Sequence, residues 1–153
     1  MNSPLSSRLY DNRNFYKSLE KDKKSAQRSV LIESPFITTR RMNVLLPVFR
    51  ELRQRGVRIV INTRSPEEHD AEYQRQAVLA VYEMQKLDVT VLYTVKHHRK
   101  LAIIDKEILW EGSLNILSQN DSCEIMRRSE SKQLALQMEK FIGLDKYVYR
   151  QDG

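Results

Sequence analysis

Residues 29–61, SVLIESPFITTRRMNVLLPVFRELRQRGVRIVI, decide the expected fold. The run Ser29–Ser34 is short and rich in β-branched residues, as in a buried strand, and Pro35 ends it. Gly56 stands where a left-handed helix cap is favoured, and the apolar run 57–61 follows it. Between them, apolar residues recur at steps of three or four, on one helical face: Met42, Leu45, Phe49 and Leu52. The stretch therefore predicts a strand, a helix and a second strand.

A second unit of the same kind follows. Ser65-Pro66-Glu67-Glu68 predicts a helix start, because Ser65 can cap, Pro66 suits the first helical position and Glu68 completes a capping box. The buried stripe of this helix is expected at Ala77, Val81, Met84 and Leu87. The run VTVLY, 89–93, then predicts a third strand. Two strand–helix–strand units with short connections indicate a parallel sheet with right-handed crossovers.

Two segments leave alternatives open. Pro47 lies inside the first helical pattern, and an interior proline removes a hydrogen bond, so this helix either starts near Asn43 or kinks there. Residues 10–28 are compatible with a helix that carries a narrow apolar stripe and ends in a lysine-rich turn. Cations in a last turn suit the helix dipole, so these lysines are interpreted first as solvated and second as phosphate contacts.

The pattern changes in the second half of the chain. The strand-like runs RKLAIID (99–105) and EILWEG (107–112) meet in a predicted hairpin, so the sheet should be mixed. A helix is expected over 131–142. We expect residues 1–9 to be a polar tail and residues 10–150 to form one α/β domain, with a mixed, largely parallel β-sheet flanked by helices on both faces.

Composition agrees with one soluble globular domain. The chain has 153 residues, of which 41% are hydrophobic and 30% charged, and it has no apolar run near the ~20 residues of a membrane span. The first residues lack the apolar core of a signal peptide, and a single cysteine cannot form an intramolecular disulfide, so a cytoplasmic setting is expected. A net charge of +6 favours a polyanionic partner, although a solubilising surface would also account for it.

The chemistry is concentrated in residues 96–128, KHHRKLAIIDKEILWEGSLNILSQNDSCEIMRR. In an extended chain, residues two apart project together, so His98 and Lys100 should share one face. Ser113 and Asn115 should share a face at the end of the neighbouring strand, after the flexible Gly112. Four polar side chains can therefore converge at one edge of the sheet.

These four groups suit a phosphodiester substrate. Imidazole is a nucleophile at neutral pH and can form a covalent phosphoryl adduct. A lysine and neutral donors can stabilise the charge that develops on the non-bridging oxygens, and no metal is needed. Glu124 could accept the second imidazole N–H and fix the tautomer. The residues also lack zinc-ligand spacing and two-metal carboxylate clusters, so neither a metal nor another cofactor is expected.

The same stretch resembles the HKD signature of the phospholipase D superfamily. The resemblance comprises H-R-K, four apolar residues, Asp105, six further residues and G-S-L-N, with the glutamate at 124. In length and single-motif layout the chain is similar to small bacterial HKD endonucleases. HKD modules attached to DNA helicases are also similar to this chain in three longer stretches of sequence, ESPFITTRR, WEGSLNILSQND and EIMRR.

The resemblance implies a phospholipase D-like fold and a role for each motif residue. It makes His98 the covalent nucleophile, gives phosphate binding to Lys100, Ser113 and Asn115, and makes Glu124 a residue that orients a histidine. Asp105 and Gly112 are then structural members of the motif. The parity of Asp105 along the strand, opposite to that of His98, agrees with this.

The mechanism of this superfamily needs two histidines, and the chain supplies one H-x-K. His97 should face away from His98, and His69 has no lysine two positions on. A two-fold homodimer that shares one centre would supply the second His98. We therefore expect a homodimer as the active unit.

Other candidates are weaker. Arg40, Arg41, Arg99, Arg127 and Arg128 could contact phosphate, although each is individually more typical of a solvated surface. Cys123, on the face opposite to Glu124, is expected to pack in the core.

The leading hypothesis is thus a metal-independent hydrolase, a nuclease that cleaves DNA in preference to RNA through a phosphohistidine. One alternative is a phospholipid phosphodiesterase or phosphatidyl transferase, against which the lack of a membrane segment counts. Another is a catalytically weak nucleic-acid-binding module that works with a helicase domain or partner.

Overall fold

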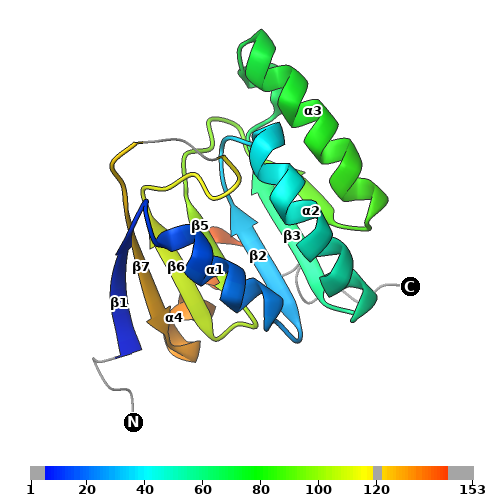
Figure 1. The fold of residues 1–153 in the computed structure, drawn as a ribbon. Helices are drawn as coiled ribbons and strands as arrows, with labels where there is room; N and C mark the ends of the chain where they lie inside the picture. Colours follow the sequence, from blue (N-terminus) through cyan, green and yellow to red (C-terminus); the bar gives the residue numbers. More distant parts are fainter. Residues whose placement is uncertain (1–5, 119–121, 145–153) are drawn as a thin grey trace.

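The computed structural model describes residues 6–118 and 122–144, which form one sheet covered by helices on both faces (Figure 1). The strands lie in the order β1-β7-β6-β5-β2-β3-β4. The elements in chain order are β1 (Ser7–Asp11), α1 (Phe15–Lys24), β2 (Ser29–Glu33), α2 (Thr39–Gln54), β3 (Arg58–Thr63), the 3-10 turn η2 (Pro66–Glu68), α3 (Ala71–Lys86), β4 (Thr90–Tyr93), β5 (Leu101–Ile104), β6 (Ile108–Gly112), β7 (Ile125–Glu130) and α4 (Lys132–Ile142). The predicted α/β domain with a mixed sheet is confirmed.

The sheet is less parallel than expected. Among the described residues, β2 pairs with β3 and β3 with β4 in parallel. The other pairs, β2–β5, β5–β6, β6–β7 and β1–β7, are antiparallel. The two crossover units account for the two parallel pairs, as predicted, whereas the hairpin and the strands around it make the other four pairs antiparallel.

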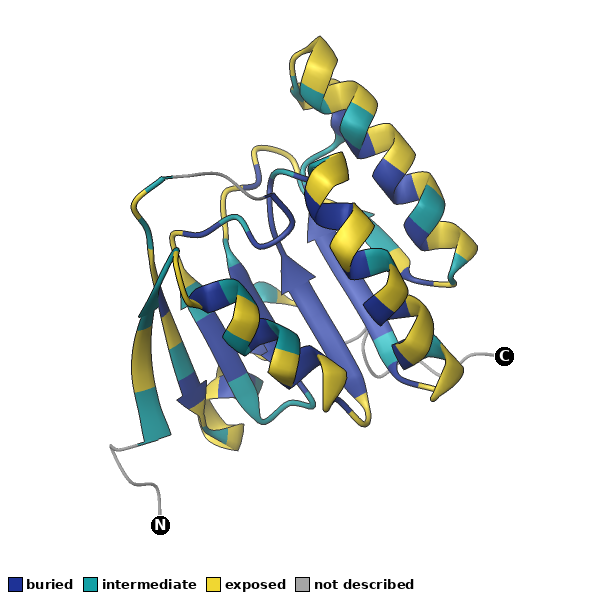
Figure 2. Ribbon diagram, in the orientation of Figure 1, coloured by how far each residue is buried: buried dark blue, intermediate teal, exposed yellow. Residues whose placement is uncertain are grey.

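Two apolar layers hold the helices to the sheet. On one face α1, α2 and α3 pack over side chains such as Ile32, Ile61 and Trp110. On the other face α4 covers the alternate side chains, such as Leu31 and Ile103. Because both faces are covered, β2 is buried along its whole length and β3 along nearly all of it (Figure 2). This layer structure leaves the ends of the central strands as the place for polar groups.

The helix predicted to begin at Ser65 begins later. Pro66–Glu68 forms only a 3-10 turn, and Ser65 makes no side-chain cap bond. His69 is extended, which ends the turn. The side chain of Asp70 then caps α3 by accepting a hydrogen bond from the Tyr73 amide. The sequence carries two start signals here, and the aspartate cap is the one that starts the long helix.

The boundaries near the N-terminus also differ from those predicted. β1 lies at 7–11, inside and beyond the predicted polar tail, and pairs antiparallel with β7. Its hydrogen bonds come from a strand more than a hundred residues later, so local pattern could not show it. α1 begins at Phe15. α2 begins at Thr39 and continues past Pro47 to Gln54 as one helix. The Thr38 hydroxyl accepts from the Arg41 amide and so caps α2 earlier than expected.

Candidate active site

The predicted site residues come from segments that meet at one edge of the sheet. β2 and β3 end there, β5 begins there after the connection that carries His98, and β6 ends there before the loop that carries Ser113 and Asn115. In Figure 1 both loops lie at the upper edge of the sheet. The topology therefore gathers residues from distant parts of the chain.

The two adjacent histidines lie in opposite environments. His98 is exposed, whereas His97 is buried, with only 2% of its surface accessible. His97 Nε2 lies 3.7 Å from Glu33 Oε2, at the end of β2. The two side chains therefore lie on opposite sides of this connection, with His97 turned toward Glu33 and His98 toward the surface.

A buried carboxylate, Glu33, supports this segment from below. Arg99 donates to it through Nε and Nη2 at 2.6 and 2.8 Å, and Asn62 donates through Nδ2 at 2.6 Å. Burial by itself would raise the pKa of Glu33, but the interactions with His97, Arg99 and Asn62 outweigh burial and hold that pKa below its ordinary value. Glu33 is therefore a fixed anion that fastens the His97–Arg99 backbone to the sheet.

Lys100, Ser113 and Glu124 lie together beside His98. Lys100 Nζ donates to the His98 carbonyl at 2.8 Å. The pKa of Glu124 is lowered from its ordinary value. The largest cause is a hydrogen bond from Ser113, followed by a hydrogen bond from Ser122 and the charge of Lys100. These contacts place a cation, a hydroxyl and a carboxylate in one cluster. Within residues 6–118 and 122–144, no hydrogen bond or ion pair joins Glu124 to His98.

The loop after β6 is held in place by close backbone contact. Ser113 bonds to Ile125 three times: its amide and its hydroxyl donate to the carbonyl, and its hydroxyl accepts from the amide. A Cβ on Gly112 would lie 2.1 Å from the Ile125 carbonyl oxygen, so only glycine permits this approach. Asn115 Oδ1 is buried and has no hydrogen-bond partner within residues 6–118 and 122–144, a group that a functional site would use.

Asp105 lies away from this cluster, at the β5–β6 turn. Its carboxylate accepts from the amides of Gln27, Arg28 and Ser29 at 2.7–3.1 Å. Asp105 itself has a positive φ of 54°. The side chain therefore joins the hairpin to the chain entering β2.

The expected basic contacts divide into free and engaged side chains. Arg40 is exposed, but Arg41 is buried, pairs with Glu20 and lies 4.2 Å above the Tyr16 ring. The structure gives no support for Arg41 as a phosphate contact, because its side chain is almost fully buried and paired with Glu20.

The remaining arginines also have internal partners. Arg128 bonds to the Asp22 carboxylate through two nitrogens, and Trp110 donates to the same group. Arg127 donates to the Ser7 hydroxyl, and Arg99 is engaged by Glu33. The proposed role of Cys123 in the core is wrong as well, because Cys123 is exposed in the segment before β7.

Sequence reasoning missed two residues at the site. Arg64, directly after β3, donates to Nε2 of His98 at 2.8 Å and to the His97 carbonyl at 2.9 Å. Its place after a parallel strand was a usable signal, because ligands bind outside the carboxyl ends of such strands. The Tyr16 hydroxyl donates to the carbonyls of Asn115 and Ser118, from a helix with no sequence signal for that contact.

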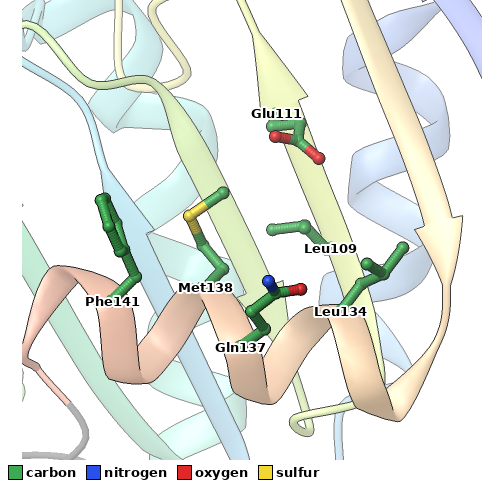
Figure 3. Close-up of a pocket in the computed structure, with 6 residues that line it drawn as sticks. All are labelled: Leu109, Glu111, Leu134, Gln137, Met138 and Phe141. Atoms are coloured by element: carbon green, nitrogen blue, oxygen red, sulfur yellow. The ribbon is translucent and has the colours of Figure 1, made fainter.

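Other features do not provide an alternative centre. A hollow between α4 and β6 is lined by Leu109, Glu111, Leu134, Gln137, Met138 and Phe141 (Figure 3). Its only charged side chain is an acid, which does not suit an anionic phosphodiester. In the described part of the chain, no group of three or more histidine, cysteine or acidic side chains could hold a metal ion. None of the described helices is long and apolar enough to cross a membrane.

Comparison with known proteins gives one family match. The model described as "Cardiolipin synthase, PLD-like domain" matches residues 19–144. Among curated proteins, no significant match was found.

Several solved structures have a similar fold. NucT from Helicobacter pylori aligns with a TM-score of 0.71 and 21% identity, over 88% of this chain and 91% of NucT. Nuc from Salmonella typhimurium, a phospholipase D family member, aligns with a TM-score of 0.68 and 17% identity, over 89% of this chain and 90% of Nuc. Phosphatidylserine synthase from Haemophilus influenzae aligns with a TM-score of 0.60 and 12% identity, over 95% of this chain and 39% of the synthase. At these identities the likeness concerns the fold.

Proposed function

We propose that this chain, which belongs to the phospholipase D superfamily through its PLD-like domain, is a nuclease that forms a covalent phosphohistidine without a metal. One observation carries the proposal: His98 is exposed on a rigid base of Glu33, His97 and Arg99, with Lys100 beside it. An accessible imidazole next to a cation suits attack on an anionic phosphodiester.

The proposed reaction has two displacements. First, Nε2 of His98 attacks phosphorus, a nitrogen–phosphorus bond forms, and the bond to the leaving oxygen breaks as that oxygen takes a proton from a second histidine. Then a water molecule gives a proton back to that histidine and attacks phosphorus, which breaks the nitrogen–phosphorus bond. One water is consumed, and His98 is restored.

Three side chains are assigned to the charge on the non-bridging oxygens. Lys100 supplies a cation held against the His98 backbone. The amide group of Asn115 and the hydroxyl of Ser113 are proposed as neutral donors from the loop that Gly112 keeps close to β7, and the hydroxyl must turn from its present acceptors to the phosphate. Loss of one preorganised donor typically costs about a hundredfold or more in rate. Glu124, with its lowered pKa, remains a carboxylate near neutral pH and can accept an imidazole N–H.

The second histidine is proposed to come from a second copy of the chain. His97 is buried beside Glu33, and His69 stacks with Phe36 and Tyr73 in an aromatic cluster. His98, which is exposed and next to Lys100, is therefore proposed as the reacting histidine, and a two-fold axis near it would bring its counterpart. Glu124 would then serve the His98 of either copy.

The supporting argument for nucleic acid is electrostatic. The net charge of +6 and the sheet-edge cations Lys100 and Arg64 favour a polyanion over a neutral substrate. DNA is proposed in preference to RNA, with action alone or beside a helicase domain, and no cofactor is invoked.

The test is cleavage of labelled single- and double-stranded DNA and RNA in excess EDTA. We expect cleavage that EDTA leaves intact and that His98→Ala and Lys100→Ala abolish. Lys132→Ala is the matched control for lysine loss, because Lys132 is exposed at the start of α4. Cleavage that chelation stops, or that survives in His98→Ala, would contradict the proposal.

A second candidate activity is a phospholipid phosphodiesterase or phosphatidyl transferase. It is favoured by the description of the matching family model, which refers to cardiolipin synthase. Vesicles containing phosphatidylglycerol or cardiolipin, added to the same assay, distinguish the two. Release of headgroup or transfer between lipids, with nucleic acid left intact, would replace the nuclease by this activity. Binding of nucleic acid without turnover would instead indicate a binding module.

A further inference from the structure

The guanidinium of Arg64 covers the reactive nitrogen of His98. Arg64 follows β3 directly, and its Nη2 donates to His98 Nε2 at 2.8 Å and to the His97 carbonyl at 2.9 Å. The guanidinium lies 5.4 Å from the centre of the Phe36 ring. Its Nε is buried, and no described residue forms a hydrogen bond with it. This side chain is therefore held in place by backbone, ring and packing, with one donor unused.

The contact fixes which nitrogen of His98 carries the proton. A guanidinium has only donors and stays protonated in proteins. His98 Nε2 must therefore accept the hydrogen bond, so the neutral ring carries its proton on Nδ1. In free histidine both tautomers occur, whereas here one arginine selects the tautomer whose lone pair is on Nε2.

The same position is the one that a scissile phosphate must take. Phosphorus has to approach Nε2 along the lone pair that Arg64 now occupies. A non-bridging oxygen is a stronger acceptor for a guanidinium than an imidazole nitrogen, because it carries negative charge. The Nη2 hydrogen bond to the His97 carbonyl can persist while the other contact is exchanged.

We propose that Arg64 is a phosphate-binding residue that, before substrate arrives, holds His98 as the Nε2-nucleophilic tautomer, and that it then moves from Nε2 to a non-bridging phosphate oxygen. This inference rests on the proposed function for its catalytic half. Its first half, the tautomer, concerns the free protein and is independent of activity.

Two measurements test the two halves separately. For the tautomer, nitrogen-15 NMR of the histidine rings in the free protein should show His98 with its proton on Nδ1. In Arg64→Met the His98 ring should become a mixture of the two neutral tautomers. The His98 signals are assigned as those that disappear in His98→Ala. A wild-type protein in which no neutral His98 ring carries its proton on Nδ1 overturns the inference, whatever the activity.

For the phosphate half, the measured quantities are cleavage kinetics in EDTA and binding of orthovanadate as a phosphate mimic. Arg64→Met should lower kcat about a hundredfold or more and weaken vanadate binding about tenfold or more. Arg64→Lys should recover part of both, and added guanidinium ion should partly restore Arg64→Met, which a merely structural role would not allow.

The control for arginine loss is Arg75→Met, because Arg75 is exposed on α3 and its one ion pair within the described ranges is with Glu72 at the surface. Thermal melts of all variants check that the fold persists. Unchanged kcat and vanadate affinity in Arg64→Met overturn the inference while leaving the nuclease proposal intact. A wild-type chain without any phosphodiesterase activity overturns the nuclease proposal, and the NMR result still decides the tautomer.

Discussion

At the scale of single residues, four consecutive side chains divide between support and chemistry. His97 and Arg99 lie against the buried Glu33 carboxylate. The His98 ring contacts Arg64, and Lys100 lies near Glu124. The ion pair between Arg99 and Glu33 fastens the backbone next to His98, which reduces the ordering needed when substrate binds. Preorganisation of this kind is the main contribution that a protein makes to electrostatic catalysis.

Lys23 gives a residue-scale prediction about pH. It is fully buried beside Glu20, and burial, opposed by Glu20 and reinforced by Arg41, lowers its pKa from 10.5 to about 8. Between these values the unfolded chain binds a proton that the folded chain does not, so stability rises with pH. The shift is equivalent to about 3 kcal/mol. Urea unfolding of wild type and Lys23→Met from pH 7 to 10.5 should show wild type gaining about that much relative to the variant. Parallel curves would show that Lys23 is not perturbed.

The limits of residue-level prediction follow from chain distance. Alternation along an extended chain was enough to separate His97 from His98, because both belong to one short segment. Glu33 precedes Arg99 by 66 residues, and Tyr16 precedes Asn115 by 99, so no local pattern indicated either contact. Arg41 and Arg128 were interpreted as surface cations because burial of an arginine depends on a partner that sequence does not reveal.

At the scale of elements, the hairpin and the loop after β6 carry the site. Strand and crossover positions were predictable because buried strands and amphipathic helices have strong periodic patterns. β1 was not predictable, because it depends on pairing with the distant strand β7. The start of α3 was not predictable either, because two candidate caps, Ser65 and Asp70, compete for it. Fewer strand pairs are parallel than expected for a similar reason, because the local sequence of a strand does not show in which direction it runs beside its neighbour.

The β5–β6 turn yields a prediction about Asp105. Asp105→Ala removes the acceptor for three backbone amides and should lower the free energy of unfolding by about 2 kcal/mol more than Asp88→Ala. Asp88 is the matched control, because it also has a positive φ, whereas its side chain is exposed and, among the described residues, pairs with Arg53. Activity per folded molecule should be the same in both variants. A loss of activity in folded Asp105→Ala would show that Asp105 has a direct role.

The close approach of β6 and β7 yields a second element-scale prediction. Gly112→Ala places a methyl group against the Ile125 carbonyl and the Met126 side chain, so the strands must separate. Overpacking of this kind costs about 1–3 kcal/mol. We expect lower stability and lower kcat, because Ser113 moves with the strand end. Gly56→Ala is the control, since Gly56 has positive φ but no atom within 4 Å of its Cβ. Because Ala at Gly56 is strained by its positive φ, the two variants are compared by activity per folded molecule, and an unchanged kcat in Gly112→Ala would contradict the account of Gly112.

At the scale of the whole molecule, the account requires two chains for one reaction. The fold supplies one exposed His98 per chain, and the second histidine is proposed to come from a partner copy. Neither the pairing of two chains nor the position of their axis can be predicted from local patterns, since both depend on surfaces that meet only in the assembly.

Mixing experiments test the shared centre. If each centre needs two His98 side chains, activity in a fully exchanged mixture of wild type and His98→Ala should fall as the square of the wild-type fraction. At equal amounts, about a quarter of the activity per total chain would remain, against about a half for independent chains. A linear dependence, with exchange verified by tagged chains, would contradict the shared centre.

The central claim is that His98 becomes covalently bound to phosphorus. The most direct measurement is rapid quenching at alkaline pH during cleavage of a phosphorus-labelled oligonucleotide in EDTA, followed by mass spectrometry of the labelled peptide. The account predicts label on the peptide that contains His98, absent from His98→Ala and lost on further incubation with water. Turnover by wild type with no labelled peptide, or with label on another residue, would contradict it.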